Sequence, residues 1–439
     1  MLNYLKGTNN QILIINLLFI TIPLAYIFGS LFVNLNLFLI IILSLIFYKR
    51  KIFDIKFLLV DKFVILFFLY SSIVGILNTI EIYNDDNVTN DITIFLKTFL
   101  YFRYILIYFV LRFLADNNIL KFKWFFYTCA FLCLYVCAEI FYQFLFGQDF
   151  FGNKINPIQR KLSGPFGNEW VAGGYLLRFS FFGIFAIAIF SNFKNNVAKN
   201  LIISSMVLIF LIGILLSGNR IPFVFFIIGI SLIMLFEKKT RKFLPIILFI
   251  TSIIFYVSFK SKQEVRANYL ELFSSVKIIS YKMYALAAGH ELNYWRYNMP
   301  VIFHEWESFY DTWQMNKYFG GGIRSFRLNC PKRENIEIDE RITCNTHPHN
   351  YYLEIMTDLG LLGLIIILFV FTSAFVGPFY KKYVSKEIDN NLLIIPFLFA
   401  FFVEVFPLKS TGSFFTTNVS SIIFLYMAIL ISLSRKKQT

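Results

Sequence analysis

Residues 201–236 read LIISSMVLIFLIGILLSGNRIPFVFFIIGISLIMLF, and this stretch decides the fold class. Two apolar runs surround a short turn at 217–220, and Arg220 is the one charged residue in the stretch. A helix needs about 20 apolar residues to cross a bilayer core of roughly 30 Å. Because lipid offers no partner for an exposed backbone, apolar runs of this kind form helices. The stretch therefore predicts two membrane-spanning helices joined by a tight turn.

Similar apolar runs recur along almost all of the 439 residues, of which 58% are hydrophobic and 15% charged. Soluble domains usually carry about 25% charged residues. We predict an all-α, polytopic transmembrane helical bundle of about 12 spans with one long, partly helical extracytoplasmic loop. Three regions result: N-terminal helices at 1–259, the long loop at 260–358 and C-terminal helices at 359–439. The expected spans are 11–29, 31–48, 63–80, 92–114, 124–146, 170–190, 200–217, 221–236, 243–259, 359–378, 391–407 and 417–434.

The formal net charge of +15 does not indicate a nucleic-acid partner, because the basic residues fall in clusters in every second loop. The clusters lie at 49–51, 121–123, 238–242, 381–382 and 435–437. Cytoplasmic loops of membrane proteins carry such an excess of lysine and arginine. The pattern predicts cytoplasmic N- and C-termini, and outward loops at 81–91, 147–169 and 260–358. No removable signal peptide is expected.

The outward segment at 260–358 holds all four histidines and two cysteines, Cys330 and Cys344. Loops longer than about 15 residues tend to be functional. In an oxidising compartment the two cysteines are expected to form a disulfide. The alternative is a zinc site made by Cys330, Cys344, His347 and His349, although their spacing fits no standard ligand pattern.

The strongest local signal is THPHNYYLE at 346–354, where the long loop returns to the membrane. Pro348 disfavours helix at the residue before it, and Asn350 is a suitable cap for the helix that follows. His349 would then lie beside a helix N-terminus, which disfavours a protonated imidazole. A neutral imidazole suits a general base for a hydroxyl. The competing interpretation is a purely structural loop histidine.

Two outward turns add charged candidates. In the turn at 217–220, Arg220 precedes Pro222, which suits the first turn of a helix, so Arg220 should lie at an anion-binding helix start. Its guanidinium could hold a phosphate with two hydrogen bonds, or it could reach lipid headgroups instead. The turn RKLSGPFGNE at 160–169 ends in Glu169, which could orient a basic residue, bind a sugar or simply favour the following helix.

Four ionisable residues are expected at membrane depth, where such residues usually pair and serve function. They are Arg103, Glu139, Arg178 and Glu404. A shared polar cluster beneath the loop is one possible arrangement.

Together these motifs resemble the O-antigen ligase and polymerase family of bacterial inner-membrane glycan transferases. Four motifs account for the resemblance. They are the His349-Asn350 pair before an apolar helix with Gly360 and Gly363, the turns at 160–169 and 217–220, and GGGIRSFR at 320–327. The resemblance spans the architecture of most of the chain, while its specific motifs occupy about 160–174, 217–222 and 317–363.

This resemblance implies a metal-independent glycosyltransferase without a cofactor. It would move a glycan from a polyprenyl-diphosphate-linked donor to lipid A–core or to another lipid-linked glycan at the periplasmic face. His349 would be the base and Arg220 would bind the diphosphate. A basic residue of the long loop would assist, with Arg327 preferred over Arg266, Arg296 and Arg324. The other expected substrate-binding residues are Arg160, Glu169, His347 and Asn350.

Two other classes of function compete with the transferase. A transporter or flippase of lipid-linked saccharides would usually show internal repeats and midplane binding groups, and the sequence shows no repeat of fixed period. A non-catalytic membrane docking subunit would explain the aromatic loop but not the settings of Arg220 and His349. Within the transferase class, the motifs do not separate a ligase from a polymerase.

Overall fold

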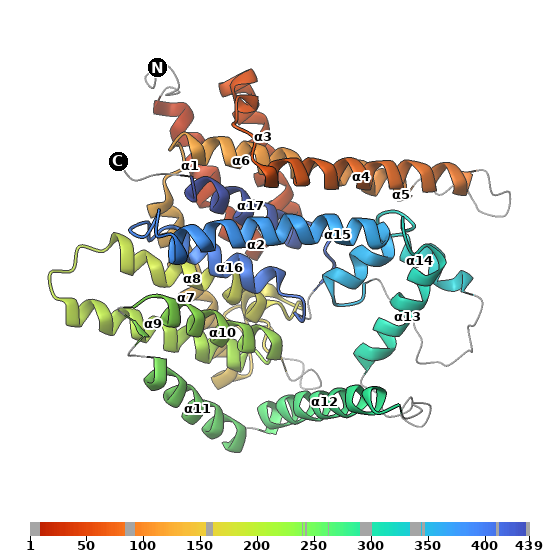
Figure 1. The fold of residues 1–439 in the computed structure, drawn as a ribbon. Coiled ribbons are helices and arrows are strands. Elements are labelled where there is room, and N and C mark those ends of the chain that lie inside the picture. Colours follow the sequence, from red (N-terminus) through yellow and green to blue (C-terminus); the bar gives the residue numbers. More distant parts are fainter. Residues whose placement is uncertain are drawn as a thin grey trace.

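The computed structural model describes residues 9–83, 93–154, 161–238, 240–241, 244–261, 263–289, 301–333, 344, 347–409 and 412–435. These residues are almost all helical or in connecting turns, and the one β-type pairing among them is an isolated bridge between Gln148 and Lys154 (Figure 1). The all-α prediction is confirmed for this part of the chain.

The helices follow the apolar runs closely. The N-terminal region contains α1 (Asn9–Ile20), α2 (Ile22–Phe28), α3 (Ser30–Tyr48), η2 (Lys49–Phe53), α4 (Leu59–Tyr83), α5 (Thr93–Tyr101), α6 (Arg103–Asp116), α7 (Phe122–Phe146), η4 (Gly164–Phe166), α8 (Ala172–Phe190), α9 (Asn196–Leu216), α10 (Arg220–Phe236) and α11 (Leu244–Ser261). The predicted loop contains α12 (Gln263–Ala287), α13 (Val301–Met315), α14 (Phe326–Asn329) and η7 (Cys330–Lys332). The chain continues with α15 (Tyr351–Phe379), the π-helical turn η8 (Tyr380–Val384), α16 (Ile394–Val405) and α17 (Thr417–Leu433).

Seven of the described helices are long and apolar enough to cross a membrane, or up to nine if each of two bent pairs is one span. Three shorter apolar helices, α10, α16 and α17, fall below that length. Each of the twelve predicted ranges overlaps one of these helices or bent pairs. Membrane helices are therefore present as predicted, while the count of twelve stays a prediction.

The centre of the bundle is α17, in which every residue from Val419 to Leu433 is buried. Figure 1 shows this helix between α6 and α15. Its Phe424 ring packs against Phe68 of α4 at 5.1 Å and stacks on Tyr104 of α6 at 6.2 Å. Aromatic pairs at these separations contribute about 0.5–1.5 kcal/mol beyond their burial. The core is thus built from helices distant in sequence.

One end of the bundle is held by ion pairs between α4, α6 and the end of α17. Arg112 and Asp61 have fully buried side chains with 2.9 Å between Nη1 and Oδ1. Asp116 accepts from Arg112 at 3.2 Å and from Arg435 at 2.8 Å. Lysines 381 and 382 of η8 lie at the same end, where Lys381 Nζ donates to Ser434 O. We call this the basic end, because Lys381, Lys382 and Arg435 lie there.

The opposite end, which we call the cavity end, is organised by a break in α15. Gly360 interrupts that helix with φ of 67° and ψ of −174°. The freed backbone groups meet the chain just before α14: Leu361 N donates to Lys317 O at 2.9 Å, and Leu362 N donates to Tyr318 O at 3.2 Å. Gly322 N donates to Asp358 O at 2.8 Å. The long loop is therefore bonded to the membrane helix through its backbone.

The start of α15 differs from the start of the predicted span, while the loop boundary at 358 stays a prediction. The long loop was expected to end at 358 and the next span to begin at 359, but α15 begins at Tyr351. Hydropathy placed the boundary at the kink, because the turns before Gly360 carry polar residues such as Glu354 and Asp358. The helix nevertheless starts earlier, where Asn350 caps it.

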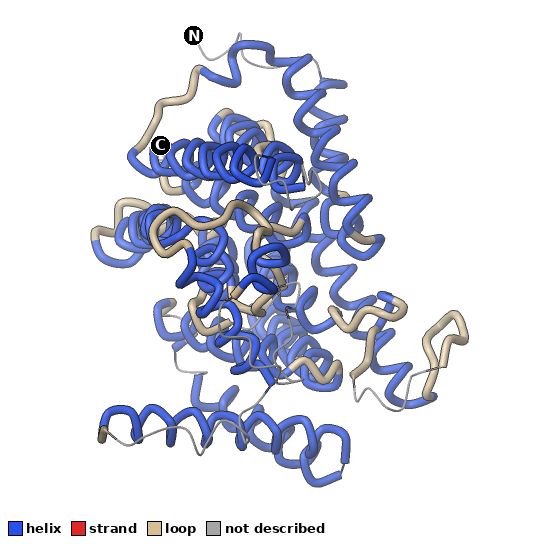
Figure 2. Tube along the Cα trace, turned by 90° about the vertical axis from the view of Figure 1, so that its right-hand side faces the viewer, coloured by secondary structure: helices blue, strands red, loops and turns tan. Residues whose placement is uncertain are grey.

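The helix α12 lies along one side of the molecule, apart from the main bundle (Figure 1). Figure 2 also shows a long helix along that edge. Among the described helices it packs against α10 and α11. Its polar side chains and its position make it a wall of the cavity described below.

Gly360→Ala is expected to destabilise the protein markedly. The backbone conformation at Gly360 is one that only glycine adopts easily, at a cost of about 1–3 kcal/mol for another residue. A Cβ there would also lie 2.2 Å from Tyr318 O. The measurement is the midpoint temperature of unfolding of the purified protein in detergent.

Gly377→Ala provides the matched control in the same helix, because a Cβ added at Gly377 would meet no heavy atom within 4 Å and the residue has no positive φ. This variant should unfold at or slightly above the wild-type midpoint. Equal midpoints for the two variants would contradict the importance of the backbone contact.

Candidate functional site

A cavity of about 1800 Å³ opens at the cavity end of the bundle. Typical small-molecule pockets measure about 300–1,000 Å³, so this one is suited to a large ligand. Its walls come from α2, α8, α10, α12, α13, α14, α17 and the chain segments before α8, α14, α15 and α17. Five of the predicted site residues line it, namely Glu169, Arg220, Arg327, His347 and His349. Asn350 adjoins it, and Arg160 lies outside the described residues.

Asn350 fixes the start of α15, as the sequence predicted. Its Oδ1 accepts from Tyr352 N at 3.0 Å and from Leu353 N at 3.1 Å. Its Nδ2 donates to Pro407 O at 2.8 Å, which joins the cap to the segment between α16 and α17. The amide oxygen and the amide nitrogen of Asn350 are therefore both hydrogen-bonded within the protein. Asn350 thus fixes the backbone next to His349.

His349 has a left-handed backbone conformation, with φ of 52°. Such a conformation is uncommon for a residue other than glycine and persists where the surroundings impose it. Here Asn350 is held on one side, and on the other Pro348 O accepts from Trp306 Nε1 of α13 at 2.9 Å. The rings of His347 and His349 lie 4.3 Å apart and face the same cavity.

His347 is held in its neutral form. Burial lowers the pKa of its imidazole to about 4, and the proximity of His349, Arg324 and Arg327 acts in the same direction. A neutral imidazole can both donate and accept a hydrogen bond. His347 is therefore suited to contact a hydroxyl-rich ligand at neutral pH.

Arg220 is the first residue of α10, and the turn before it is bonded to the segment before α8. Asn219 Oδ1 accepts from Gly173 N at 3.0 Å, and Leu162 N donates to Ser217 O at 3.1 Å. A Cβ on Gly173 would lie 2.6 Å from Ser217 Oγ, so only glycine allows this approach. These contacts bring two motifs that are far apart in sequence to one wall of the cavity.

Arg220 is engaged only weakly. Its Nη1 donates to Asn268 O at 3.0 Å, and its Nη2 lies 3.5 Å from Glu271 Oε1 on α12. The Glu271 side chain is 60% exposed. Exposed ion pairs contribute about 0–1 kcal/mol, so an anionic ligand could replace this carboxylate.

Lys161 lies near Arg220 on the same wall. Burial lowers the pKa of its amine, and the nearby positive charge of Arg220 lowers it further, while Glu271 acts in the opposite direction. This wall thus carries two neighbouring cations and one exposed carboxylate.

The predicted cluster of Arg103, Glu139, Arg178 and Glu404 is wrong as a single cluster, because only its last two members pair. Arg178 Nη2 lies 2.8 Å from Glu404 Oε1. Glu139 instead accepts from Phe150 N at 3.1 Å. Arg103 lies at the start of α6 and contacts Tyr104 and Thr417.

Sequence reasoning missed Lys409, which completes this pair within the segment between α16 and α17. Its Nζ lies 2.5 Å from Glu404 Oε2, and both Lys409 and Arg178 line the cavity. Burial lowers the pKa of Lys409 to about 8, although Glu404 opposes that shift. A single lysine beyond an apolar run carries no signal that it turns inward.

Arg327, near the glycine turn at 320–322, was the preferred loop arginine, and the structure brings both Arg324 and Arg327 to the cavity. Asp358 of α15 holds this turn: its Oδ2 accepts from Arg324 N at 2.7 Å, and its Oδ1 accepts from Ser325 Oγ at 3.3 Å. Arg266 does not line the cavity, and Arg296 lies outside the described residues.

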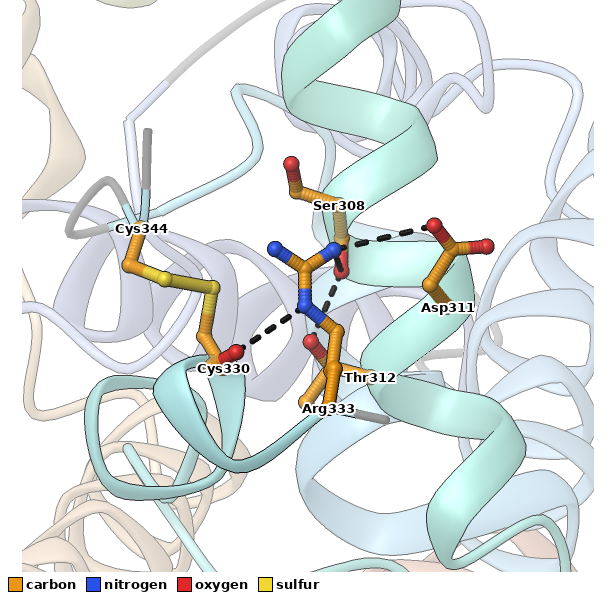
Figure 3. The surroundings of a disulfide bond; sticks show 6 residues. All are labelled: Ser308, Asp311, Thr312, Cys330, Arg333 and Cys344. Atoms are coloured by element: carbon orange, nitrogen blue, oxygen red, sulfur yellow. Dashed lines mark hydrogen bonds and ion pairs between the residues drawn. A yellow bond between two sulfur atoms is a disulfide. The ribbon is translucent and has the colours of Figure 1, made fainter. Parts of the chain in front are cut away.

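Cys330 and Cys344 form the predicted disulfide (Figure 3). Since both thiols are consumed in this bond, the zinc site considered from the sequence is excluded. Arg333 Nε donates to Cys330 O at 2.9 Å, and its Nη1 lies 3.6 Å from Asp311 Oδ2 on α13. The closed loop is thereby attached to the helix whose Trp306 contacts Pro348.

The cavity combines positive charge with apolar surface. Its lining includes six lysine or arginine residues and three glutamates. The bases are Lys161, Arg178, Arg220, Arg324, Arg327 and Lys409; the acids are Glu169, Glu271 and Glu305. Apolar side chains of α2, α10 and α12 complete the lining, among them Phe28, Ile221, Leu272 and Ile279. This lining suits an anionic amphiphile.

A comparison with known protein families finds a match that covers part of the cavity lining. Residues 205–368 match the family model described as O-antigen ligase. The matched range contains Arg220, Arg327 and His349. No curated protein matches the chain. Over residues 205–368 the family match confirms the predicted resemblance, while the turn at 160–169 lies outside the matched range.

The neutral state of His347 can be measured by NMR of the protein labelled at histidine. The imidazole of His347, assigned with His347→Gln, should stay neutral as the pH falls from 7 to 5, because its pKa is about 4. Since the unfolded chain binds this proton near pH 6.5, the fold should lose stability as the pH falls from about 6.5 to 4. His347→Gln should reduce that loss. A titration midpoint above about 6 would contradict the burial of this ring.

Proposed function

We propose that this chain, matched to the O-antigen ligase family over residues 205–368, is a membrane glycosyltransferase. Its donor is a glycan linked to a polyprenyl diphosphate, and its acceptor is a hydroxyl of lipid A–core or of another lipid-linked glycan. The observation that carries the proposal is that His349 and Arg220 line the same large cavity. Apolar and cationic surfaces side by side in that cavity suit a lipid with a charged headgroup.

In the proposed reaction, His349 accepts the proton of the acceptor hydroxyl through a ring nitrogen. The acceptor oxygen attacks the anomeric carbon of the donor sugar and forms the new glycosidic bond. The bond between that carbon and the diphosphate oxygen breaks, and polyprenyl diphosphate leaves with the electron pair. A positioned base of this kind contributes typically about 10²–10⁴-fold to a rate.

Arg220 and Lys161 stabilise the negative charge that develops on the leaving diphosphate. Arg220 can bind two oxygens in a fork, and the backbone N–H groups at the start of α10 add further donors. The diphosphate replaces Glu271 as the partner of Arg220. Charge stabilisation by groups already in position is often the largest contribution to catalysis.

The remaining predicted residues have supporting roles in this proposal. Glu169, Arg327 and His347 contact the sugars or the acceptor, and Arg160 belongs to the same set by its motif. Asn350 acts through His349, whose backbone it holds. No cofactor and no metal take part.

The proposed topology has twelve spans in the bacterial inner membrane. Both termini and the basic end face the cytoplasm, and the cavity end faces the periplasm. The support is that Lys381, Lys382 and Arg435 lie together at the basic end, as the positive-inside rule requires of cytoplasmic residues.

The transfer is tested with purified protein, a polyprenyl-diphosphate-linked oligosaccharide and either acceptor, with EDTA present. His349→Ala should lower the turnover number at least about 100-fold, since it removes the base. Arg220→Lys should lose less activity than Arg220→Ala, because lysine keeps the positive charge and loses only the paired hydrogen bonds that a guanidinium makes to two phosphate oxygens. The product formed identifies the acceptor.

Glu271→Gln is the matched control on the same wall. It should keep its activity and lower the KM for the donor, because the carboxylate no longer competes for Arg220. The wild type, His349→Ala and Arg220→Ala could instead all move the lipid-linked glycan across liposome membranes without forming product. That result would contradict the transferase and favour a transporter.

A further inference from the structure

A second, smaller cavity of about 240 Å³ lies behind the wall formed by the turn before α14 and the start of α17. Nine residues line it, and none of them is acidic. Three are cations from three different elements: Lys97 of α5, Arg103 of α6 and Arg324 of the glycine turn. The hydroxyl of Thr417 and the amide of Asn34 add uncharged polar groups.

Lys97 and Arg103 form no ion pair with a carboxylate within the described part of the chain, whereas the charge of Arg324 also acts on Asp358 and Glu354 of α15. Arg103 donates to Leu100 O at 2.6 Å and to Tyr104 OH at 2.7 Å, both of which are neutral acceptors. Its Nε is buried without a hydrogen-bond partner there. Like charges that converge in a confined space repel each other unless an anion joins them. The second cavity therefore has the composition of an anion site.

Arg324 lines both cavities. On one side its charge contributes to the lowered pKa of His347. On the other side it completes the group with Lys97 and Arg103. Arg220 and Lys161, which the proposed function assigns to the donor diphosphate, do not line the second cavity. Arg324 is therefore the lining residue that the two cavities share.

We propose that this second cavity is a subsite for a phosphoryl group of the acceptor, with Arg324 shared between it and the cavity that holds His349. A tetrahedral phosphoryl group needs donors from several directions, and the cations here come from three elements. Guanidinium groups bind phosphate oxygens in pairs, and lysine adds a point charge. Assignment to the acceptor rests on the proposed function, whereas the affinity for a phosphoryl group does not.

Binding is measured by native mass spectrometry of the full chain in detergent, with dihexanoyl phosphatidic acid as the probe. All proteins carry Arg220→Ala, so that the donor site contributes little. In this background Lys97→Gln should weaken binding at least about tenfold. Lys194→Gln, which removes the same charge from an exposed residue outside both cavities, should leave binding unchanged. Equal affinity of the Lys97 and Lys194 variants would overturn the proposal.

Two competitors identify what the site recognises. Dihexanoylglycerol, which lacks the phosphate, should not displace the probe; displacement by it would overturn the phosphoryl assignment. Inorganic phosphate should displace the probe only at concentrations at least about tenfold higher, because it lacks the apolar part of the ligand. Displacement by free phosphate at equal concentration would assign the site to a small anion and overturn its assignment to a lipid acceptor.

The transfer assay then separates this inference from the proposed function. In a chain with Arg220 intact, Lys97→Gln should raise the KM for the acceptor and leave the KM for the donor unchanged. A raised donor KM alone would assign the second cavity to the donor. If neither the wild type nor any variant transfers glycan, the proposed function is wrong. The effect of Lys97→Gln on probe binding would still test whether the second cavity binds a phosphoryl group.

Discussion

The backbone contact between the glycine turn at 320–322 and the break in α15 at Gly360 holds the long loop against the membrane helices. Leu361 and Leu362 donate to carbonyls of the incoming chain, and Asp358 accepts from the turn with its carboxylate and its own carbonyl. Hydrogen bonds of this kind must be satisfied inside a membrane protein, so the two segments complete each other. Because Arg324 donates its backbone N–H to Asp358 beside this break, the position of Arg324 depends on this contact.

The chemistry of the site follows from how its charges are held. Arg178 and Lys409 share the buried Glu404, so their excess charge is fixed in the wall. Arg220, in contrast, contacts the carbonyl of Asn268 and an exposed glutamate at 3.5 Å, so its charge is not neutralised by a buried carboxylate. The protein thus separates cations that shape the cavity from cations that can exchange partners, and this division agrees with a site that binds and releases a diphosphate.

Local sequence patterns predicted the parts of this structure that depend on near neighbours. The helical class, the Asn350 cap, the helix start at Arg220 and the disulfide all follow from composition or short motifs. Long-range pairing was less accessible: nothing in the sequence links Lys409 to Glu404 and Arg178, and hydropathy could not show that α15 continues past Gly360 toward Tyr351. Spacing also could not separate Arg324 from Arg327, because the turn at Asp358 brings both to the cavity.

The helix at the centre of the bundle, α17, follows every helix around it in sequence. Its residues from Val419 to Leu433 contact protein on all sides, so no lipid-facing surface remains on it. During synthesis the earlier helices must therefore enter the membrane around a vacancy, which lipids or a chaperone fill until α17 arrives. The last helix to be synthesised therefore completes the core of the bundle. Chains that end before residue 417 would lack this core helix and should be degraded more readily by membrane proteases.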